Sequence, residues 1–166
     1  GLPEGEITVE CDAVPAAAQV TATDNCQEVV DVVYNQEIEE GNCPGNYTIY
    51  RTWSAADSCE NGVEFTQTIH VQDTTAPVFD EYEFYAHIEC DEIPALLTAT
   101  DNCGSATVEV IYEILNSGGC LGVYHRIYRA TDECGNTSET EQYIAIQDTT
   151  DPEIIGVPAD ATIECN

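Results

Sequence analysis

Hydrophobic and polar residues alternate along several stretches of this chain. In residues 63–72 the two kinds separate onto opposite faces, with Val63, Phe65, Ile69 and Val71 on the apolar face and Glu64, Thr66, Thr68, His70 and Gln72 on the polar face. A period of two is typical of a β-strand that buries one face. Residues 20–23, 29–34 and 47–54 show the same pattern, so we predict strands there.

Turn-forming residues separate these stretches. The cluster at residues 40–46 contains two glycines, two asparagines and a proline, which favour tight turns. Counting such segments gives about seven short strands in each unit of roughly 75 residues. The pattern therefore predicts an all-β protein made of tandem immunoglobulin-like antiparallel β-sandwich modules.

The chain also repeats itself, which defines these units. Thr-Ala-Thr-Asp-Asn-Cys occupies residues 21–26 and returns at residues 98–103, and Gln-Asp-Thr-Thr-Ala-Pro at residues 72–77 returns as Gln-Asp-Thr-Thr-Asp-Pro at residues 147–152. Gly-Val-Pro at residues 156–158 matches Gly-Leu-Pro at residues 1–3. We predict a first sandwich repeat over residues 1–76, a second over residues 77–152, and the first strand of a truncated third repeat over residues 153–166.

Charge narrows the classes of partner. The sequence has 32 acidic residues and only 3 Lys or Arg, giving a formal net charge of −29. Such a surface repels nucleic acid and anionic membranes, because both require a positive partner surface. Hydrophobic residues still make up 43% of the chain, so it can bury a core. Cationic partners, divalent metals first among them, are the expected complement.

The nine cysteines indicate a disulfide framework. They contain no Cys-x-x-Cys pair, and their wide spacing does not suit a zinc site. Disulfides form in oxidising compartments, so we expect an extracellular location. Each full repeat has four cysteines in the same order, and Cys165 is expected to be unpaired because its repeat is truncated.

Strand geometry favours one pairing within each repeat. Residues 47–57, read as one strand, span about 33 Å, whereas bonded cysteines need Cα atoms within roughly 7 Å, so Cys43 and Cys59 should not pair. Cys26 and Cys59 fall at the same end of the sandwich, which we call the leading end. The predicted pairs are Cys26–Cys59 and, by elimination, Cys11–Cys43, with Cys103–Cys134 and Cys90–Cys120 in the second repeat. Nearest-neighbour pairing, Cys11–Cys26 and Cys43–Cys59, remains the alternative if the strands are shorter.

Asp and Asn recur beside these cysteines, which predicts a tentative calcium site at each leading end. Oxygen ligands from three segments are expected to converge at the junction of the repeats, and Ca²⁺ takes six to eight such ligands. The alternative is that Asp and Asn simply form turns there. The candidate ligands are Asp24, Asn25 and Asp57 in the first repeat, and Asp73, Asp101, Asn102 and Asp132 at the junction.

Enzyme chemistry has little support in the sequence. The three histidines are isolated at strand-like positions, and no Gly-x-Ser-x-Gly motif is present. We therefore predict a non-enzyme with no catalytic residues. Trp53, the only tryptophan, could form an aromatic sugar platform with Tyr47 and Tyr50, although such residues more often pack in a core.

The repeated motifs carry a family resemblance. Thr-Ala-Thr-Asp-Asn-Cys, Ala-Thr-Asp-Glu-Cys-Gly-Asn and Asp-Thr-Thr-Ala-Pro resemble the tandem HYR-like modules of large secreted surface adhesins and fibres of Bacteroidota-type cells. The resemblance covers essentially the whole chain. It implies an immunoglobulin-like fold, secretion to the cell surface, no catalysis, and O-glycosylation at Thr74, Thr149 and, more weakly, Ser58.

These observations lead to one prediction and two alternatives for function. The prediction is a disulfide-stapled structural segment of a long extracellular adhesin or fibre, rigidified by calcium, that contacts neighbouring repeats of its own chain. One alternative is a repeating subunit of a glycosylated filament, whose partners are identical subunits. The other is a carbohydrate-binding module, whose partners are surface glycans.

Overall fold

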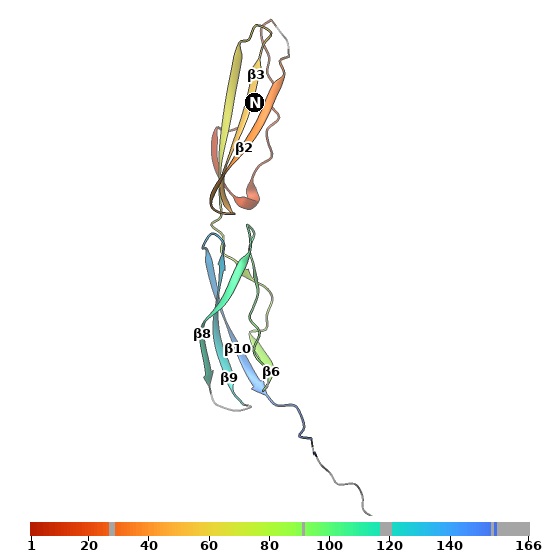
Figure 1. Ribbon diagram of the computed structural model, residues 1–166, viewed down its shortest axis with the longest axis vertical. Coiled ribbons are helices and arrows are strands. Elements are labelled where there is room, and N and C mark those ends of the chain that lie inside the picture. The colour runs from red at the N-terminus through yellow and green to blue at the C-terminus, as the bar shows by residue number, and fades with distance from the viewer. Residues whose placement is uncertain (27–28, 91, 117–120, 154, 156–166) are drawn as a thin grey trace, which may run out of the picture.

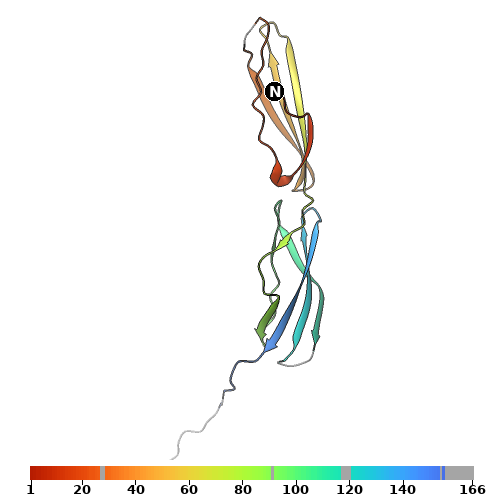
Figure 2. The same cartoon turned by 180° about the vertical axis from the view of Figure 1, so that it is seen from behind.

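The computed structural model describes residues 1–26, 29–90, 92–116, 121–153 and 155 of the 166-residue chain. Two β-rich repeats lie end to end, with their long axes nearly aligned (Figures 1 and 2). The short segment of residues 73–77 connects them. No helix in the described ranges is long and apolar enough to span a membrane.

Repeat 1 is built on one four-stranded sheet. Its order is β1-β4-β3-β2, formed by Glu6–Glu10, Gly62–Gln72, Asn46–Ala56 and Val32–Cys43, respectively. β1 runs parallel to β4, and the other two pairs are antiparallel. A short 3-10 turn, η1 (Cys11–Ala13), follows β1 directly.

Repeat 2 reproduces this sheet and adds a small second one. The order β6-β10-β9-β8 is formed by Tyr85–Glu89, Thr137–Gln147, Val123–Asp132 and Ala106–Asn116, and β6 is parallel to β10. β5 (Val78–Phe79) pairs with β7 (Ala99–Thr100) in a separate two-stranded sheet. The all-β prediction is confirmed, with one parallel pair in each repeat where only antiparallel pairs were expected.

The core of repeat 1 follows the predicted alternation. Ile49, Ile69 and Val71 are buried, and Ile7, Val9 and Val14 pack against them. Val14 comes from the segment after η1, so this irregular segment covers the sheet as a second layer. Burial of one face of each strand is what stabilises the sandwich.

The described strands are longer and fewer than the seven short strands predicted. In repeat 1, residues 20–23 contribute only an isolated bridge between Ala22 and Val30. The preceding Pro15 lacks the N–H that a strand ladder uses, and Ala16, Ala17 and Ala18 offer little side chain to pack. This segment therefore lies over the sheet without forming regular strands.

Arginine occupies the inward face of both central strands. Arg51 and Arg126 are 5% and 8% exposed, beside the buried Gln67 and Gln142. Arg126 pairs with Glu113 and donates to the carbonyl of Pro94. Two of the chain's three cationic side chains are therefore used inside the repeats, which leaves the surface almost wholly acidic.

Candidate functional site at the repeat junction

Two disulfides of the described residues cross from repeat 1 to repeat 2. Cys11, at the start of η1, bonds Cys103 with a Cα–Cα distance of 5.8 Å. Cys43, at the end of β2, bonds Cys134 with a Cα–Cα distance of 5.2 Å. Both distances are ordinary for disulfides. The end of a repeat that carries Cys11 and Cys43 is called the trailing end below.

These bonds correct the predicted connectivity. Cys11–Cys43 and Cys103–Cys134 are wrong as pairs, and so is the nearest-neighbour alternative. The assignment of Cys11 and Cys43 to one end was right, but elimination assumed that each repeat closes on itself, whereas the trailing end of repeat 1 faces the leading end of repeat 2.

Cys26 and Cys59 also differ from their prediction. Within the described ranges they are exposed and not joined to each other. The predicted Cys90–Cys120 pair and the unpaired Cys165 cannot be compared, because Cys120 and Cys165 lie outside the described residues.

Aspartate turns present the junction cysteines. Asp101 Oδ1 accepts a hydrogen bond from the backbone N–H of Cys103, and Asp132 Oδ1 accepts one from that of Cys134, both at 2.8 Å. Asp132 also accepts two bonds from Asn136, one from the backbone and one from the side chain. These bonds to Asn136 hold the pKa of Asp132 below its usual value although burial opposes them. The turn role considered for the aspartates is therefore present at the junction.

The same turns occur at the leading end of repeat 1. Asp24 accepts from the backbone N–H of Cys26, and Asp57 accepts from those of Cys59 and Asn61. Hydrogen bonds from Asn61 lower the pKa of Asp57. Asp24 and Asp57 line one recess, as the assignment of their loops to one end requires. Asn25, the remaining candidate ligand there, is exposed in the same loop.

The linker is attached to repeat 1 by Glu10, the last residue of β1. Its carboxylate accepts the backbone N–H and the hydroxyl of Thr74, and these bonds lower the pKa of Glu10. Repeat 2 has the same arrangement, in which Glu89 accepts from the N–H and hydroxyl of Thr149 and its pKa is lowered. Sequence reasoning missed this contact, although Glu-Cys and Asp-Thr-Thr recur together in both repeats.

The linker also packs tightly between the repeats. Asp73 is 6% exposed, donates its N–H to Asn46 Oδ1 at 2.7 Å, and accepts at its carbonyl from Asn136 Nδ2 at 3.1 Å. A side chain on Gly45 would place Cβ only 2.6 Å from the Cβ of Asp73. Pro77 is fully buried in repeat 2, and its carbonyl accepts from Ser138 Oγ. Residues of both repeats thus enclose the linker.

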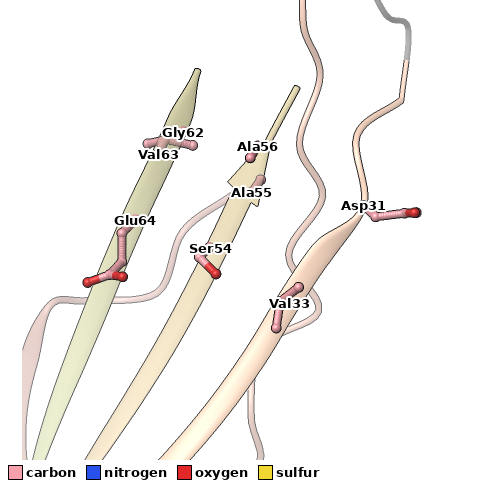
Figure 3. Close-up of a pocket in the computed structure, with 8 residues that line it drawn as sticks. All are labelled: Asp31, Val33, Ser54, Ala55, Ala56, Gly62, Val63 and Glu64. Atoms are coloured by element: carbon pink, nitrogen blue, oxygen red, sulfur yellow. The ribbon is translucent and has the colours of Figure 1, made fainter. Parts of the chain in front are cut away.

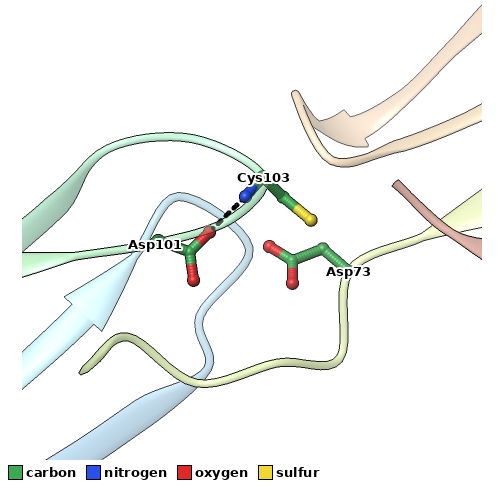
Figure 4. Close-up of side chains that lie close together, drawn as sticks. All are labelled: Asp73, Asp101 and Cys103. Atoms are coloured by element: carbon green, nitrogen blue, oxygen red, sulfur yellow. Dashed lines mark hydrogen bonds between the residues drawn. The ribbon is translucent and has the colours of Figure 1, made fainter. Parts of the chain in front are cut away.

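An acidic cluster lies within the junction. Potential ligand atoms of Asp73, Asp101 and Cys103 lie within 4.8 Å of one another (Figure 4). Burial raises the pKa of Asp73 most, and the charges of Asp101, Asp132 and Glu10 raise it further. Asp101 Oδ2 is buried and, among the described atoms, has no hydrogen-bond partner.

The cluster fits a divalent cation in charge and in donor type. Two carboxylates supply the hard oxygens that Ca²⁺ prefers, and an orphaned buried oxygen is costly without a partner. Cys103 is already bonded to Cys11 and has no thiolate to offer. Asp132 spends both oxygens on its turn, and Asn102 Nδ2 lies 3.9 Å from the Sγ of Cys11. The structure therefore brings Asp73 and Asp101 together more closely than the other predicted ligands.

The threonines expected to carry glycans have other contacts. Thr74 and Thr149 are exposed, but each hydroxyl donates to a glutamate of the preceding strand. Ser58 is exposed at the leading end of repeat 1. A glycan on either threonine would remove a donor that holds the linker.

The aromatic residues are arranged differently from the predicted sugar platform. Trp53 is 4% exposed and packs against Tyr34 and Phe65, so it cannot stack on a sugar. In repeat 2, the ring of Tyr143 stacks on those of Tyr85 and His125. The alternation of the strand, which places Trp53 on the apolar face with Ile49, already favoured its burial.

Comparisons with known proteins give distant likenesses only. No family model matches the chain, and no curated protein matches its sequence. Human protocadherin-24 EC1-2 is 14% identical, with coverage of 89% of this chain and 95% of that chain and a TM-score of 0.33. The protocadherin GammaB4 extracellular domain is 13% identical, covering 84% and 31%, with a TM-score of 0.34. Mouse clustered PcdhgC3 EC1-3 is 12% identical, covering 89% and 67%, with a TM-score of 0.35. The architecture stated above rests on the strands of this chain and not on these neighbours.

Proposed function

We propose that this chain is a rigid, non-enzymatic segment of a long extracellular cell-surface adhesin or fibre. The observation that carries the proposal is the pair of disulfides, Cys11–Cys103 and Cys43–Cys134, that joins successive repeats. With the linker, they make three covalent connections across one junction. A single connection leaves repeats free to swing, whereas three separate ones resist both bending and twisting.

The proposed domain division follows the sequence repeats. Residues 1–76 and 77–152 each form one sandwich unit in this proposal, and residues 153–166 begin a third. The resemblance to HYR-like repeats of large Bacteroidota-type surface adhesins supports the same reading. In such an array each repeat contacts mainly its neighbours, so the array acts as a spacer.

The location follows from the chemistry of the junction. Disulfides persist in oxidising compartments, and an acidic surface keeps a long rod soluble. Surface display on the cell is the part of the proposal that comes from the family resemblance. Neighbouring repeats are the proposed partners.

A calcium ion at Asp73 and Asp101 is the second part of the proposal. Bound there, the ion would neutralise the two carboxylates and give Asp101 Oδ2 a partner. The carboxylates face the linker from both repeats, because Asp73 belongs to the linker and Asp101 to the loop that presents Cys103. Binding would therefore stiffen the same junction that the disulfides hold.

Small-angle X-ray scattering tests the role of the disulfides. We expect the oxidised chain to scatter as one elongated particle. The double variant Cys11→Ser, Cys43→Ser should scatter as two repeats in many relative orientations. Cys26→Ser, Cys59→Ser is the matched control and should scatter like the parent. Equal flexibility in the parent and the junction variant would overturn the proposal.

A further inference from the structure

We propose that the leading end of repeat 1 is a docking face for the trailing end of a second copy of this chain, with Cys26 and Cys59 forming disulfides to that copy. The inference rests on the proposed role of the junction as a rigid link. It assigns a partner to a face that the two-repeat chain leaves open.

The first argument is the state of equivalent cysteines. Cys26 and Cys59 occupy in repeat 1 the positions that Cys103 and Cys134 occupy in repeat 2. The same aspartate turns present all four, through Asp24, Asp57, Asp101 and Asp132. Cys103 and Cys134 are bonded to another repeat, whereas in the described chain Cys26 and Cys59 are free and exposed. The leading end of repeat 1 is therefore one half of a junction.

The second argument is a recess where repeat 2 has an occupant. In repeat 2, Pro77 is fully buried, Ser138 Oγ donates to its carbonyl, and the following β5 pairs with β7. The repeat register places Val63 at the position of Ser138, and Ala22 and Thr23 at those of β7. These three residues line a recess of about 220 Å³ with Ala55.

The wider surface around this recess is open and apolar in part. Val63, Ala55 and Ala56 also line a larger hollow of about 530 Å³ at the ends of three strands (Figure 3). Val63 is 67% exposed, whereas Ala130, the counterpart of Ala55, is completely buried in repeat 2. A segment like residues 77–79 of the linker would cover this surface.

The third argument is that the trailing end of repeat 2 already has the shape of a docking partner. Thr149 is held by Glu89 as Thr74 is held by Glu10. The backbone N–H of Thr150 donates to Asp148 at 3.1 Å, as that of Thr75 donates to Asp73. Pro152, which corresponds to Pro77, is exposed, and Ile155 is 87% exposed. One chain thus displays both halves of the junction, at opposite ends.

A polar contact completes the match. At the junction, Asn136 Nδ2 donates both to Asp132 and to the linker carbonyl of Asp73. Asn61, its counterpart, donates from Nδ2 to Asp57 and is exposed. Its second N–H is positioned for the carbonyl of Asp148 in the docked copy.

The covalent step is an ordinary oxidation of thiols. Each new S–S bond joins Cys26 or Cys59 to a trailing-end cysteine that stands in its repeat where Cys11 or Cys43 stands. Two protons and two electrons leave the two thiols, and they reduce one molecule of oxidised glutathione to two of glutathione. Because the two faces differ, the contact is head to tail and adds copies in an open chain.

Isotope-mixed oxidation tests the proposal. Equal amounts of ¹⁵N-labelled and unlabelled full chain are incubated in a glutathione redox buffer, free thiols are alkylated, and disulfide-linked peptides are mapped by mass spectrometry. We expect Cys26 and Cys59 peptides bonded to trailing-end peptides of the other isotope, and a non-reducing ladder with steps of 18.0 kDa. Cys26→Ser, Cys59→Ser should remain monomeric. A Cys26–Cys59 bond within one chain, or links between like cysteines of two copies, would overturn the proposal.

A fused protein separates poor fit from slow encounter. Residue 155 of one copy is joined to Gly1 of the next, because residues 156–158 repeat residues 1–3. Disulfides from Cys26 and Cys59 of the second copy to the first copy support the docking face. If the thiols stay free here too, the inference fails. The rigidity of the junction between repeats 1 and 2 is measured separately by scattering, so that proposal stands or falls independently.

Discussion

Glu10 accepts two hydrogen bonds from Thr74, one from its backbone N–H at 3.1 Å and one from its hydroxyl at 2.7 Å. The strand that ends repeat 1's parallel pair thereby fixes the direction in which the linker leaves. Glu89 and Thr149 repeat the contact in repeat 2. The linker threonine therefore acts as an orientation device as well as a spacer.

Replacing Thr74 by Val should free the linker and raise the pKa of Glu10 towards its ordinary value. A carboxylate whose folded-state pKa is lowered contributes stability above its unfolded pKa, and that contribution is lost as pH falls through the folded pKa. The variant should therefore be less stable than the parent at neutral pH and equally stable at strongly acidic pH. NMR titration of Glu10 and thermal unfolding across pH measure both effects. Thr75→Val is the control, since only the backbone N–H of Thr75 donates to Asp73, and an equal loss in both variants would contradict the account.

Removing the junction disulfides should lower the stability of the whole chain. The Cys11–Cys103 bond closes a sequence separation of 92 residues, which the chain-entropy model values at about 4 to 5 kcal/mol. Urea unfolding of Cys11→Ser, Cys43→Ser should show a loss of this order. Cys26→Ser, Cys59→Ser should leave the midpoint of the isolated monomer unchanged, and a similar loss there would argue against the observed connectivity.

Gly45→Ala should disturb the junction through sterics alone. The added Cβ would meet the Cβ of Asp73 at 2.6 Å and that of Cys103 at 3.2 Å, and neither is the flexible end of a side chain. Overpacking of this kind costs roughly 1 to 3 kcal/mol. At Gly62 the nearest atom is 3.7 Å away, so Gly62→Ala is the matched control. Urea midpoints compare the two, and equal midpoints would mean that the linker yields without cost.

Calcium should raise the unfolding midpoint of the parent, and the rise should shrink in Asp101→Asn. Asp24→Asn changes the same Asp-Asn-Cys motif at the other end of repeat 1 and should keep the full response. Thermal scans with calcium and with chelator measure the difference. An identical calcium response in Asp101→Asn and the parent would exclude the junction site.

Asp73→Asn should act in opposite directions with and without the ion. Burial raises the pKa of Asp73, so the folded state loses stability as pH rises through that pKa and the carboxylate ionises. Removing the charge should therefore raise the midpoint in chelator at neutral pH by a few degrees, while abolishing the gain from calcium. A lower midpoint in chelator would show that the carboxylate itself stabilises the linker.

The strands and the placement of loops could be read from the sequence, because alternation and repetition report local structure. Residues 63–72 form β4 with the predicted faces, and Cys26 and Cys59 lie at the predicted end. The two disulfides could not be read in this way. Cys11 and Cys103 are far apart in sequence, and their bond depends on how two folded repeats meet, which no pattern within one repeat encodes.

The acidic motifs were informative only in part. Asp-x-Cys predicted polar groups at the junction, but a turn and a metal ligand use the same residue types. Distance decides between these roles, because Asp132 spends its oxygens on Asn136 and Cys134, while Asp101 keeps one oxygen unpaired among the described atoms. Trp53 was a similar case, since its exposure depends on the layer that residues 14–23 lay over the sheet.

The joining of neighbouring repeats at three points also changes what a break in the backbone does. Proteolytic cleavage between Thr75 and Ala76 would cut the polypeptide, yet Cys11–Cys103 and Cys43–Cys134 would still hold the two parts together. Continuity of the rod therefore does not depend on an intact peptide chain at its most accessible segment. Such redundancy makes the strand tolerant of nicks in a protease-rich medium, and its weak point becomes reducing agents instead of proteases.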